Sequence, residues 1–318
     1  MKITVIGTGA FGIALANNLA SNGHSVSMWS KFEEEIVLLL LDREHKDLLP
    51  DIKIEDSIEL TSDLEKALEN TELILFAIPI KAVTEVSHKI KPYYNNCPIV
   101  LVTKGLLEKK RLSEVVEEIL NTNKVCMLSG PSFAIDVAKK FPVGLMSASK
   151  NEEIAKLIKE VFQNKSLNVA VTTDILGVEM CACIKNIFAI ITGMFDEDIE
   201  STKAMLLTNL INEYKDIIEK FGGKTETAFC YAGIGDFLLT CMNNKSRNYT
   251  FGKIYSKLND ENKVYEEMGL TTVEGVRSLK EVKELLDSEN ITVYSIDLLY
   301  DIIYGDKDAL EIYNLIKG

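Results

Sequence analysis

The sequence predicts an α/β fold, in which a doubly wound, mostly parallel sheet over residues 1–173 is followed by an all-helical second domain over residues 174–318. Three observations predict it. Apolar, β-branched runs alternate with amphipathic segments in the first half, as strands and covering helices do in a parallel sheet. The strand signals end at Thr173. Beyond it, apolar residues recur at helical spacing to the C-terminus, apart from a polar break at residues 258–267.

The N-terminal stretch predicts the first unit of this sheet. An apolar run at residues 3–6 predicts a strand, and Gly7, Gly9 and Gly12 then form a G-x-G-x-x-G pattern that opens an amphipathic helix. The first glycine permits a tight turn, the second leaves the backbone open to a pyrophosphate, and the third lets the helix lie close to the strand. The amides at the helix start face an anion. With a second strand at residues 24–30, this context predicts a Rossmann-type dinucleotide-binding unit.

The remaining elements follow the same alternation. We expect Gly7, Pro79, Lys104 and Gly130 to follow the carboxyl ends of parallel strands, where such folds bind ligands, so that one crevice collects them. Helices are predicted at residues 34–41 and 81–90, strands at residues 71–77, 97–103, 125–128, 143–148 and 167–171, and an irregular connection at residues 43–60.

Composition excludes several classes of function. The formal net charge of −13 argues against nucleic acid and anionic membranes as partners. No run reaches the roughly 18 uncharged apolar residues of a membrane span, and a chain that opens on a strand has no cleavable signal peptide. The six cysteines lack a secreted pattern and predict reduced thiols in a cytoplasmic protein. His24, His45 and His88 are scattered, and Cys181 and Cys183 point different ways on one helix, so no metal site is expected.

Ser30 and Lys31 follow the second predicted strand, where an acid commonly binds the 2′-hydroxyl of an adenosine ribose. A hydroxyl and a cation suit a 2′-phosphate instead, which favours acceptance of NADP(H). The alternative is that Lys31 is a solvated surface charge, and the acids at residues 33–35 oppose an added phosphate. The choice between NADH and NADPH stays open.

Lys185 lies inside the long apolar helix predicted at residues 175–195. Its same-face neighbours on the helix are uncharged, so they offer no ion-pair partner. Either its ammonium snorkels to water, or it is a desolvated amine with a lowered pKa that serves as a general acid or base. A second cation nearby, such as Lys104, would lower that pKa further.

Polar residues interrupt the apolar pattern further along the second domain. Asp236 follows a glycine turn and is either a helix N-cap or a carboxylate that orients a lysine or a substrate hydroxyl. Ser246, Arg247 and Asn248 place a guanidinium between two short polar side chains. This arrangement suits a phosphate, unless the segment is a plain surface turn.

Two loops of the first domain are candidate anion sites. Lys104 follows a strand, where a lysine either contacts an anion or is solvated. Residues 129–134 either present their amides to a phosphate or use Ser132 as a helix N-cap.

Seven motifs occur along the chain: GTGAFGIALA at residues 7–16, TKG at 103–105, SGPSFA at 129–134, GVEMCACIKNIFAI at 177–190, AGIGDFLLTC at 232–241, SRNYTFG at 246–252 and VEGV at 273–276. In this order they resemble those of the bacterial NAD(P)-dependent sn-glycerol-3-phosphate dehydrogenases, over nearly the whole chain. The resemblance implies that Lys185 is the proton acceptor and that Lys104 contacts both substrate and cofactor. It implies substrate contacts from Gly130, Ser132, Asp236, Ser246, Arg247 and Asn248, and cofactor contacts from Ala10, Phe11, Lys31, Ala134, Arg247 and Glu274.

Several positions depart from the family pattern. Cysteine and alanine at residues 181–182 stand where the family usually carries two glycines. The loop after this helix reads DEDIESTKAML at residues 196–206, with Ser201 where an asparagine is expected. Asn209 replaces an arginine, and Ile80 replaces a small polar residue. These changes bear on rate and substrate fit more than on reaction type.

The resemblance implies reversible hydride transfer between NAD(H) or NADP(H) and C2 of glycerol 3-phosphate, giving dihydroxyacetone phosphate, in a cytoplasmic enzyme that supplies phospholipid synthesis. Lys185 exchanges the hydroxyl proton, Asp236 orients Lys185, and Arg247 with its two neighbours holds the phosphate. The expected partner is this small phosphate substrate, without nucleic acid or stable membrane insertion. A homodimer is one option for the oligomeric state, which the sequence leaves open.

Two other functions remain open on the residues alone. One is a dehydrogenase of another small hydroxy or keto acid, whose carboxylate needs only one lysine and not the cluster around Arg247. The other is a non-catalytic nucleotide sensor, which the retained Lys185 and Asp236 argue against.

Overall fold

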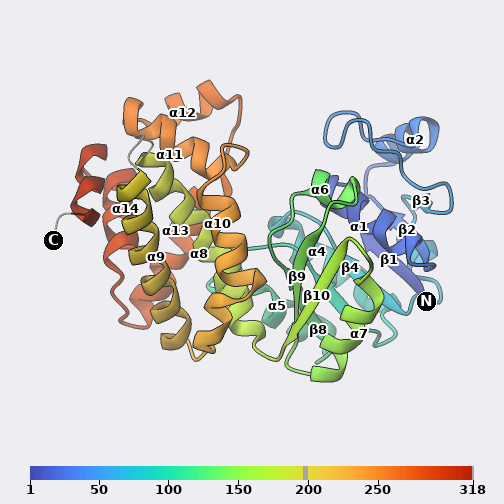
Figure 1. Cartoon of the computed structure of the whole chain (residues 1–318). Coiled ribbons are helices and arrows are strands. Elements are labelled where there is room, and N and C mark those ends of the chain that lie inside the picture. The colour runs from blue at the N-terminus through green and yellow to red at the C-terminus, as the bar shows by residue number, and fades with distance from the viewer. Residues whose placement is uncertain (196–199, 317–318) are drawn as a thin grey trace. The chain divides into compact units, whose positions relative to one another are not determined.

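The structure is a computed structural model that describes residues 1–195 and 200–316. The chain packs as two units, an α/β unit and a helical unit (Figure 1). The α/β unit comprises Met1–Lys104 and Lys110–Ile175, and the helical unit comprises Gly105–Lys109 and Leu176–Gly318. The helical unit thereby includes a short loop from within the first half of the sequence.

The α/β unit contains an eight-stranded sheet in the order β3-β2-β1-β4-β5-β8-β9-β10. The strands from β3 to β8 are parallel neighbours, β9 is antiparallel to β8, and β10 is parallel to β9, so the prediction of a mostly parallel sheet is confirmed. The strands are β1 (Lys2–Ile6), β2 (Ser25–Trp29), β3 (Glu59–Thr61), β4 (Leu73–Phe76), β5 (Ile99–Leu101), β8 (Val125–Ser129), β9 (Val143–Ala148) and β10 (Leu167–Thr172).

Helices accompany the strands of this sheet. The short edge strand β3 lies where we expected only an irregular connection, because its pairing with β2, rather than an apolar run of its own, makes it a strand. Four of these helices, α3, α5, α6 and α7, were not predicted from the sequence. The helices are α1 (Ala10–Ser21), α2 (Glu33–Asp42), α3 (Leu64–Leu68), α4 (Ile80–Ile90), η1 (Lys91–Tyr93), α5 (Leu112–Leu120), α6 (Ala134–Ala138) and α7 (Glu152–Phe162).

The strand order fixes where ligand contacts can gather. From β1 the chain builds β2 and β3 on one side and β4, β5 and β8 on the other, so the order reverses between β1 and β4. Doubly wound sheets bind ligands at such a switch point, beyond the carboxyl ends of the strands. Gly7, Pro79, Lys104 and Gly130 follow β1, β4, β5 and β8, four adjacent parallel strands. They therefore leave the same edge of the sheet, as expected.

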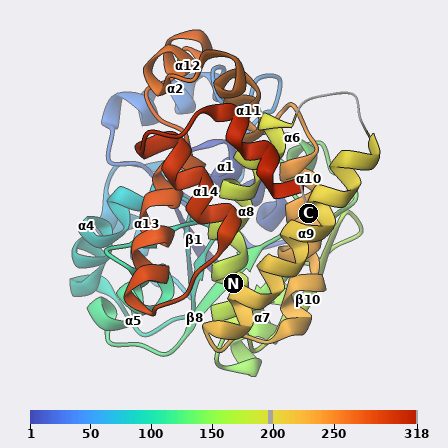
Figure 2. The same ribbon diagram turned by 90° about the vertical axis from the view of Figure 1, so that its left-hand side faces the viewer.

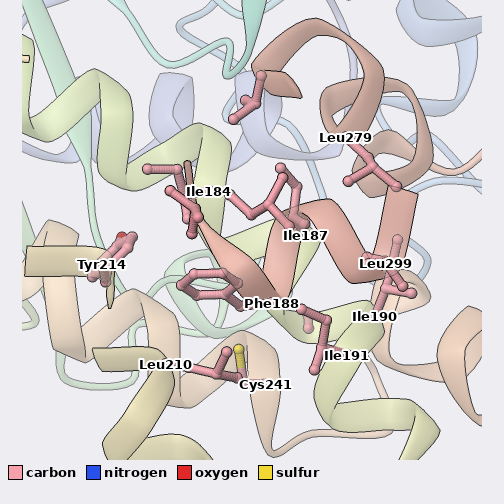
Figure 3. Close-up of a cluster of buried hydrophobic side chains, with 14 of the residues drawn as sticks. Ile184, Ile187, Phe188, Ile190, Ile191, Leu210, Tyr214, Cys241, Leu279 and Leu299 are labelled. Atoms are coloured by element: carbon pink, nitrogen blue, oxygen red, sulfur yellow. The ribbon is translucent and has the colours of Figure 1, made fainter. Parts of the chain in front are cut away.

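The helical unit is built around α8, which begins and ends within one residue of the predicted helix. Its side chains are mostly apolar, and they pack against α9, α10, α13 and α14 (Figure 3). Both ribbon views show α13 and α14 side by side (Figures 1 and 2). The elements are α8 (Ile175–Met194), α9 (Glu200–Lys220), η2 (Thr225–Phe229), η3 (Tyr231–Gly235), α10 (Asp236–Cys241), α11 (Arg247–Leu258), α12 (Glu261–Met268), α13 (Glu274–Ser288), α14 (Tyr294–Tyr304) and η4 (Ala309–Ile316), with a two-stranded sheet of β6 (Leu106–Leu107) and β7 (Lys110–Arg111).

Two glycines set the contact between α8 and α11. A Cβ on Gly193 would overlap the carbonyl oxygen of Tyr249, and a Cβ on Gly252 would overlap that of Ile190. The two backbones therefore touch, and this contact fixes the start of α11 relative to α8.

Among the described helices, α8 is also the one long and apolar enough to cross a membrane, which the sequence analysis did not anticipate. Length and composition alone are weak support for a membrane span, because 94% of its most apolar window is buried inside the fold. A core helix shows the same features.

Candidate active site

The three glycines of the first turn have different surroundings. Gly7 has φ +112°, and a Cβ there would overlap the carbonyl oxygen of Ala77. A Cβ on Gly12 would lie 2.7 Å from the carbonyl oxygen of Gly7. Among the described residues, a Cβ on Gly9 would meet no atom within 4 Å. Packing thus demands glycine at the first and third positions, whereas Gly9 faces open space that a bound molecule can use.

The start of α1 offers backbone donors beside that space. The first hydrogen bond of the helix runs from the Ile13 amide to the Gly9 carbonyl at 2.9 Å. The amides of Ala10, Phe11 and Gly12 precede this bond, and the first turn is uncharged. Such a helix start attracts an anion through its amides and the helix dipole. These residues fit the pyrophosphate of a dinucleotide.

The end of β2 differs from the sequence-based expectation. Lys31 is exposed, with its ammonium 5.2 Å from the centre of the Phe32 ring. Ser30 is buried, and its hydroxyl donates to the carboxylate of Glu35 while accepting from the Phe32 amide at 3.3 Å. The hydroxyl expected to face a phosphate therefore faces a carboxylate.

The loop after β8 is shaped by packing on β9. A Cβ on Gly130 would lie 2.5 Å from the carbonyl oxygen of Gly144. Ser132 donates to the Gly130 carbonyl at 3.1 Å, and α6 begins at Ala134 with Phe133 as its N-cap. Ser132 is therefore not the cap of that helix, and this alternative is wrong. Because α6 packs on α1, Ala134 lies near the glycine turn.

The half-buried Lys104 ends the loop after β5. The neighbouring Thr103 hydroxyl donates to the Ile78 carbonyl at 2.7 Å, which ties this loop to the end of β4. Lys104 thus follows the same sheet edge as the glycine turn.

In the helical unit, Lys185 is buried and paired. Its Nζ lies 2.5 Å from Oδ2 of Asp236, with side chains only 5% and 3% exposed, and it donates to the Thr240 hydroxyl at 3.2 Å. The snorkelling alternative is wrong for this lysine. Asp236 is the first residue of α10 and Gly235 is the N-cap, so the N-cap interpretation of Asp236 is wrong as well.

Aromatic packing holds α8 and α10 together beside this pair. Phe188, one turn from Lys185, meets Phe237 edge to face with ring centroids 6.2 Å apart. Tyr214 of α9 lies 5.7 Å from Phe237 and donates its hydroxyl to the Cys181 carbonyl at 2.7 Å. Cys181 thus sits fully buried at a tight helix contact, where the family pattern has a glycine.

Asn186 is a residue that the sequence analysis missed. It is buried next to Lys185, and its side-chain oxygen Oδ1 accepts from the side-chain amide Nδ2 of Asn248 at 2.9 Å. Asn248 in turn accepts from the Gly275 amide at 2.8 Å, and a Cβ on Gly275 would lie 2.6 Å from the Asn186 carbonyl oxygen. The signal available in the sequence was the adjacent polar pair Lys185-Asn186 inside a mostly apolar helix. Thr240 was also missed, because threonine one turn after Asp236 is unremarkable in a helix.

This network joins the start of α11 to Asn186, the residue next to Lys185 in α8. Ser246 caps α11 by accepting from the Tyr249 amide at 3.3 Å, and Ser246 and Asn248 are buried while Arg247 is exposed. The segment is a helix start and not a plain surface turn. A guanidinium and helix-start amides together suit a phosphate.

The last candidate cofactor residue, Glu274, and the positions that depart from the family pattern have different surroundings. Half-buried Glu274 begins α13 beside Gly275. Ser201 and Asn209 are exposed on α9, Ile80 is buried at the start of α4, and residues 196–199 of the departing loop lie outside the described residues.

All six cysteines, each within a described segment, are free thiols. Burial raises the pKa of the Cys183 thiol, and the nearby acids Glu179 and Glu274 add to the rise. Within residues 1–195 and 200–316, no group of three or more His, Cys, Asp or Glu side chains is placed to hold a metal ion.

The chain has the strand order and the glycine turn of a Rossmann-type α/β protein, followed by a second unit that is helical. Comparison with family models matches residues 2–155 to the N-terminal part, and residues 174–314 to the C-terminal part, of NAD-dependent glycerol-3-phosphate dehydrogenase. The chain therefore belongs to the NAD-dependent glycerol-3-phosphate dehydrogenase family, as the motifs implied.

Individual relatives agree with this assignment. A glycerol-3-phosphate dehydrogenase (NAD(P)+) of Staphylococcus epidermidis is 36% identical over 96% of this chain and 94% of its own. A glycerol-3-phosphate dehydrogenase (NAD(P)+) of Teredinibacter turnerae is 32% identical over 98% of this chain and 93% of its own. The crystal structure of glycerol-3-phosphate dehydrogenase from Coxiella burnetii superposes with a TM-score of 0.91 at 31% identity, covering 100% of this chain and 99% of that chain.

Proposed function

We propose that the protein reduces dihydroxyacetone phosphate to sn-glycerol 3-phosphate with NADH or NADPH, reversibly, and so supplies phospholipid synthesis. The observation that carries this proposal is the buried Lys185–Asp236 pair, joined through Asn186 to the phosphate-suited start of α11. The glycine turn supports nicotinamide nucleotide as the cofactor, and when bound this group supplies or accepts the hydride at C2.

Lys185 handles the proton in this proposal. As an ammonium it donates a proton to the C2 oxygen while that carbon is reduced, and in the reverse direction the amine takes the proton back. Asp236 and Thr240 hold the ammonium in place, and its charge stabilises the oxyanion that develops on the substrate.

The phosphate group is assigned to the start of α11. Arg247 provides a bidentate donor, with Ser246 and Asn248 beside it. Lys104, Gly130 and Ser132 are assigned to the substrate as well. The residues assigned to the cofactor are Gly7, Gly9, Ala10, Phe11, Gly12, Lys31, Lys104, Ala134, Arg247 and Glu274.

An absorbance assay tests the proposal. Purified protein is mixed with dihydroxyacetone phosphate and reduced nicotinamide nucleotide, and loss of nicotinamide absorbance is followed. We expect turnover with dihydroxyacetone phosphate and far less with unphosphorylated dihydroxyacetone or a small keto acid. Absence of turnover with the phosphorylated ketone would overturn the proposal and favour a nucleotide sensor.

The variant Arg247→Ala sharpens this assay. Loss of a charge-assisted hydrogen bond costs about 1.5–3 kcal/mol, so KM for dihydroxyacetone phosphate should rise about 10- to 100-fold. The matched control is Lys245→Ala, which removes an exposed cation two residues away and should leave KM within about twofold. An unchanged KM in Arg247→Ala would remove the phosphate assignment.

A cytoplasmic location and a homodimer belong to the same proposal. Six free cysteines are typical of a reducing compartment and support the location. Light scattering during gel filtration tests the dimer, since a mass of one chain would contradict it.

A further inference from the structure

The end of β2 carries a carboxylate held in a defined position. Glu35, in the first turn of α2, turns back so that Oε2 accepts from the Ser30 hydroxyl, and Oε1 lies 3.5 Å from Nε2 of His45. These two contacts hold the carboxylate in place. Because its side chain is 27% exposed, the carboxylate is also accessible to a ligand. The adjacent Glu33 and Glu34 are exposed without such contacts to Ser30.

This carboxylate lies close to the glycine turn in the sheet. The Gly7 amide donates to the Trp29 carbonyl at 2.8 Å, and Ile6 pairs with Trp29 in the register of β1 and β2. Ser30 and Gly7 therefore leave adjacent strands at the same edge. In doubly wound nucleotide-binding folds, the end of the second strand is where the adenosine ribose lies.

The charges around this position oppose a second phosphate. The first turn of α2 carries three acids, Glu33, Glu34 and Glu35, and Lys31 precedes them by two residues. Lys31 lies over the Phe32 ring. A phosphomonoester brings about two further negative charges, which repel nearby carboxylates.

The carboxylate has acceptor capacity left for a ribose. A carboxylate offers about four acceptor sites, and Ser30 and His45 engage one on each oxygen of Glu35. We propose that Glu35 accepts a hydrogen bond from the adenosine ribose hydroxyl and repels a 2′-phosphate, so that the protein uses NADH in preference to NADPH. This inference rests on the proposed function for the place of the cofactor, and it reverses the preference expected from Ser30 and Lys31 alone.

A binding titration tests the inference without any turnover. Trp29 is the single tryptophan of the chain, buried at the end of β2, so its fluorescence reports a nicotinamide nucleotide bound nearby. Dissociation constants for NADH and NADPH are measured for the parent protein and for Glu35→Gln, which keeps an acceptor for Ser30 while removing the charge. The matched control is Glu33→Gln, which removes an equal charge two residues away.

We expect the parent protein to bind NADH at least about tenfold more tightly than NADPH, and Glu35→Gln to reduce that ratio about tenfold, with unchanged thermal stability. Glu33→Gln should change the ratio less than about threefold. Equal or tighter binding of NADPH by the parent protein would overturn the inference, as would an unchanged ratio in Glu35→Gln or an equal change in both variants.

The outcome is separable from that of the proposed function. A protein that shows the expected binding ratio but reduces no dihydroxyacetone phosphate would retain this inference and lose the reaction. A protein that reduces it equally well with both nucleotides, and binds them equally, would retain the reaction and lose the role of Glu35.

Discussion

The two units build their candidate contacts from different parts of the chain. At the glycine turn of the α/β unit, the contacts come from the backbone amides of residues 10–12, beside the open space at Gly9. In the helical unit they come from buried side chains that hold one another, Lys185 with Thr240 across 55 residues and Asn186 with Asn248 across 62. Backbone contacts are therefore encoded locally, whereas the side-chain contacts depend on the tertiary packing of α8, α10 and α11.

The largest effect that separates the two units is expected at Lys185. Lys185→Met should lower kcat about 10³-fold, because general acid-base catalysis contributes about 10²- to 10⁴-fold, while NADH affinity stays within about twofold. Steady-state turnover and Trp29 titration measure the two quantities. Turnover close to that of the parent protein would contradict the division of roles between the units. An equal loss of turnover and of NADH affinity would contradict it as well.

Folding must be controlled in this experiment, because Lys185→Met leaves the Asp236 carboxylate buried without its ammonium. Breaking a buried ion pair in this way costs about 3–5 kcal/mol. The double variant Lys185→Met with Asp236→Leu removes both charges. It should recover much of the thermal stability and none of the turnover, and recovered turnover would show that the single variant failed through folding.

The next effect lies in the α/β unit and contrasts two of its glycines. Gly12→Ala should lower the free energy of unfolding by about 1–3 kcal/mol, because the new methyl group lies 2.7 Å from the Gly7 carbonyl oxygen. Gly9→Ala should leave stability unchanged, because its methyl group meets only open space among the described residues, and it should weaken NADH binding about tenfold or more. Thermal unfolding and Trp29 titration measure both. Unaltered binding in Gly9→Ala would mean that the open space is not a nucleotide site.

The smallest effect concerns a half-buried acid of the helical unit, Glu213. Burial raises the pKa of this carboxyl, and the neighbouring Asp216 and Asp297 raise it further, while the Ser295 hydroxyl, which donates to it, lowers it. The folded chain thus binds this proton more tightly than the unfolded chain, whose carboxyl titrates near 4.5. Its contribution to stability is present below that pH and is lost as pH rises through the raised value.

Glu213→Gln should therefore raise the melting temperature at neutral pH and flatten its decline above pH 4.5. Glu219→Gln, at an exposed position of the same helix, is the control and should change the pH profile little. A lower melting temperature for Glu213→Gln at neutral pH would contradict the cost assigned to the buried charge.

This difference between the units explains what the sequence could predict. The glycine turn, the core strands and the extent of α8 follow from local pattern, and the structure has them where expected. Helices such as α5 and α7 were not located, and β3 was missed because strand pairing creates it. The residue pattern singled out Lys185 and Asp236 and left two interpretations of each, and only packing excludes snorkelling for the first and N-capping for the second.

Two details depended on packing alone. Asn186 gains its partner from the start of α11, and the glycines at 193 and 252 that set this contact are separated by a stretch of chain that no local pattern spans. From the sequence, Glu35 counted only as one of three acids that oppose an added phosphate. Its hydrogen bond with Ser30 could not be predicted, because a side chain that turns back by five residues leaves no periodic signal.

Isotope transfer tests the central claim most directly. NADH carrying deuterium at the transferable position of its nicotinamide is incubated with dihydroxyacetone phosphate and the protein, and the product is examined by nuclear magnetic resonance. We predict deuterium at C2 of glycerol 3-phosphate with the parent protein, and about 10³-fold slower transfer with Lys185→Met. Product without deuterium at C2, or equal transfer rates for the two proteins, would contradict the account.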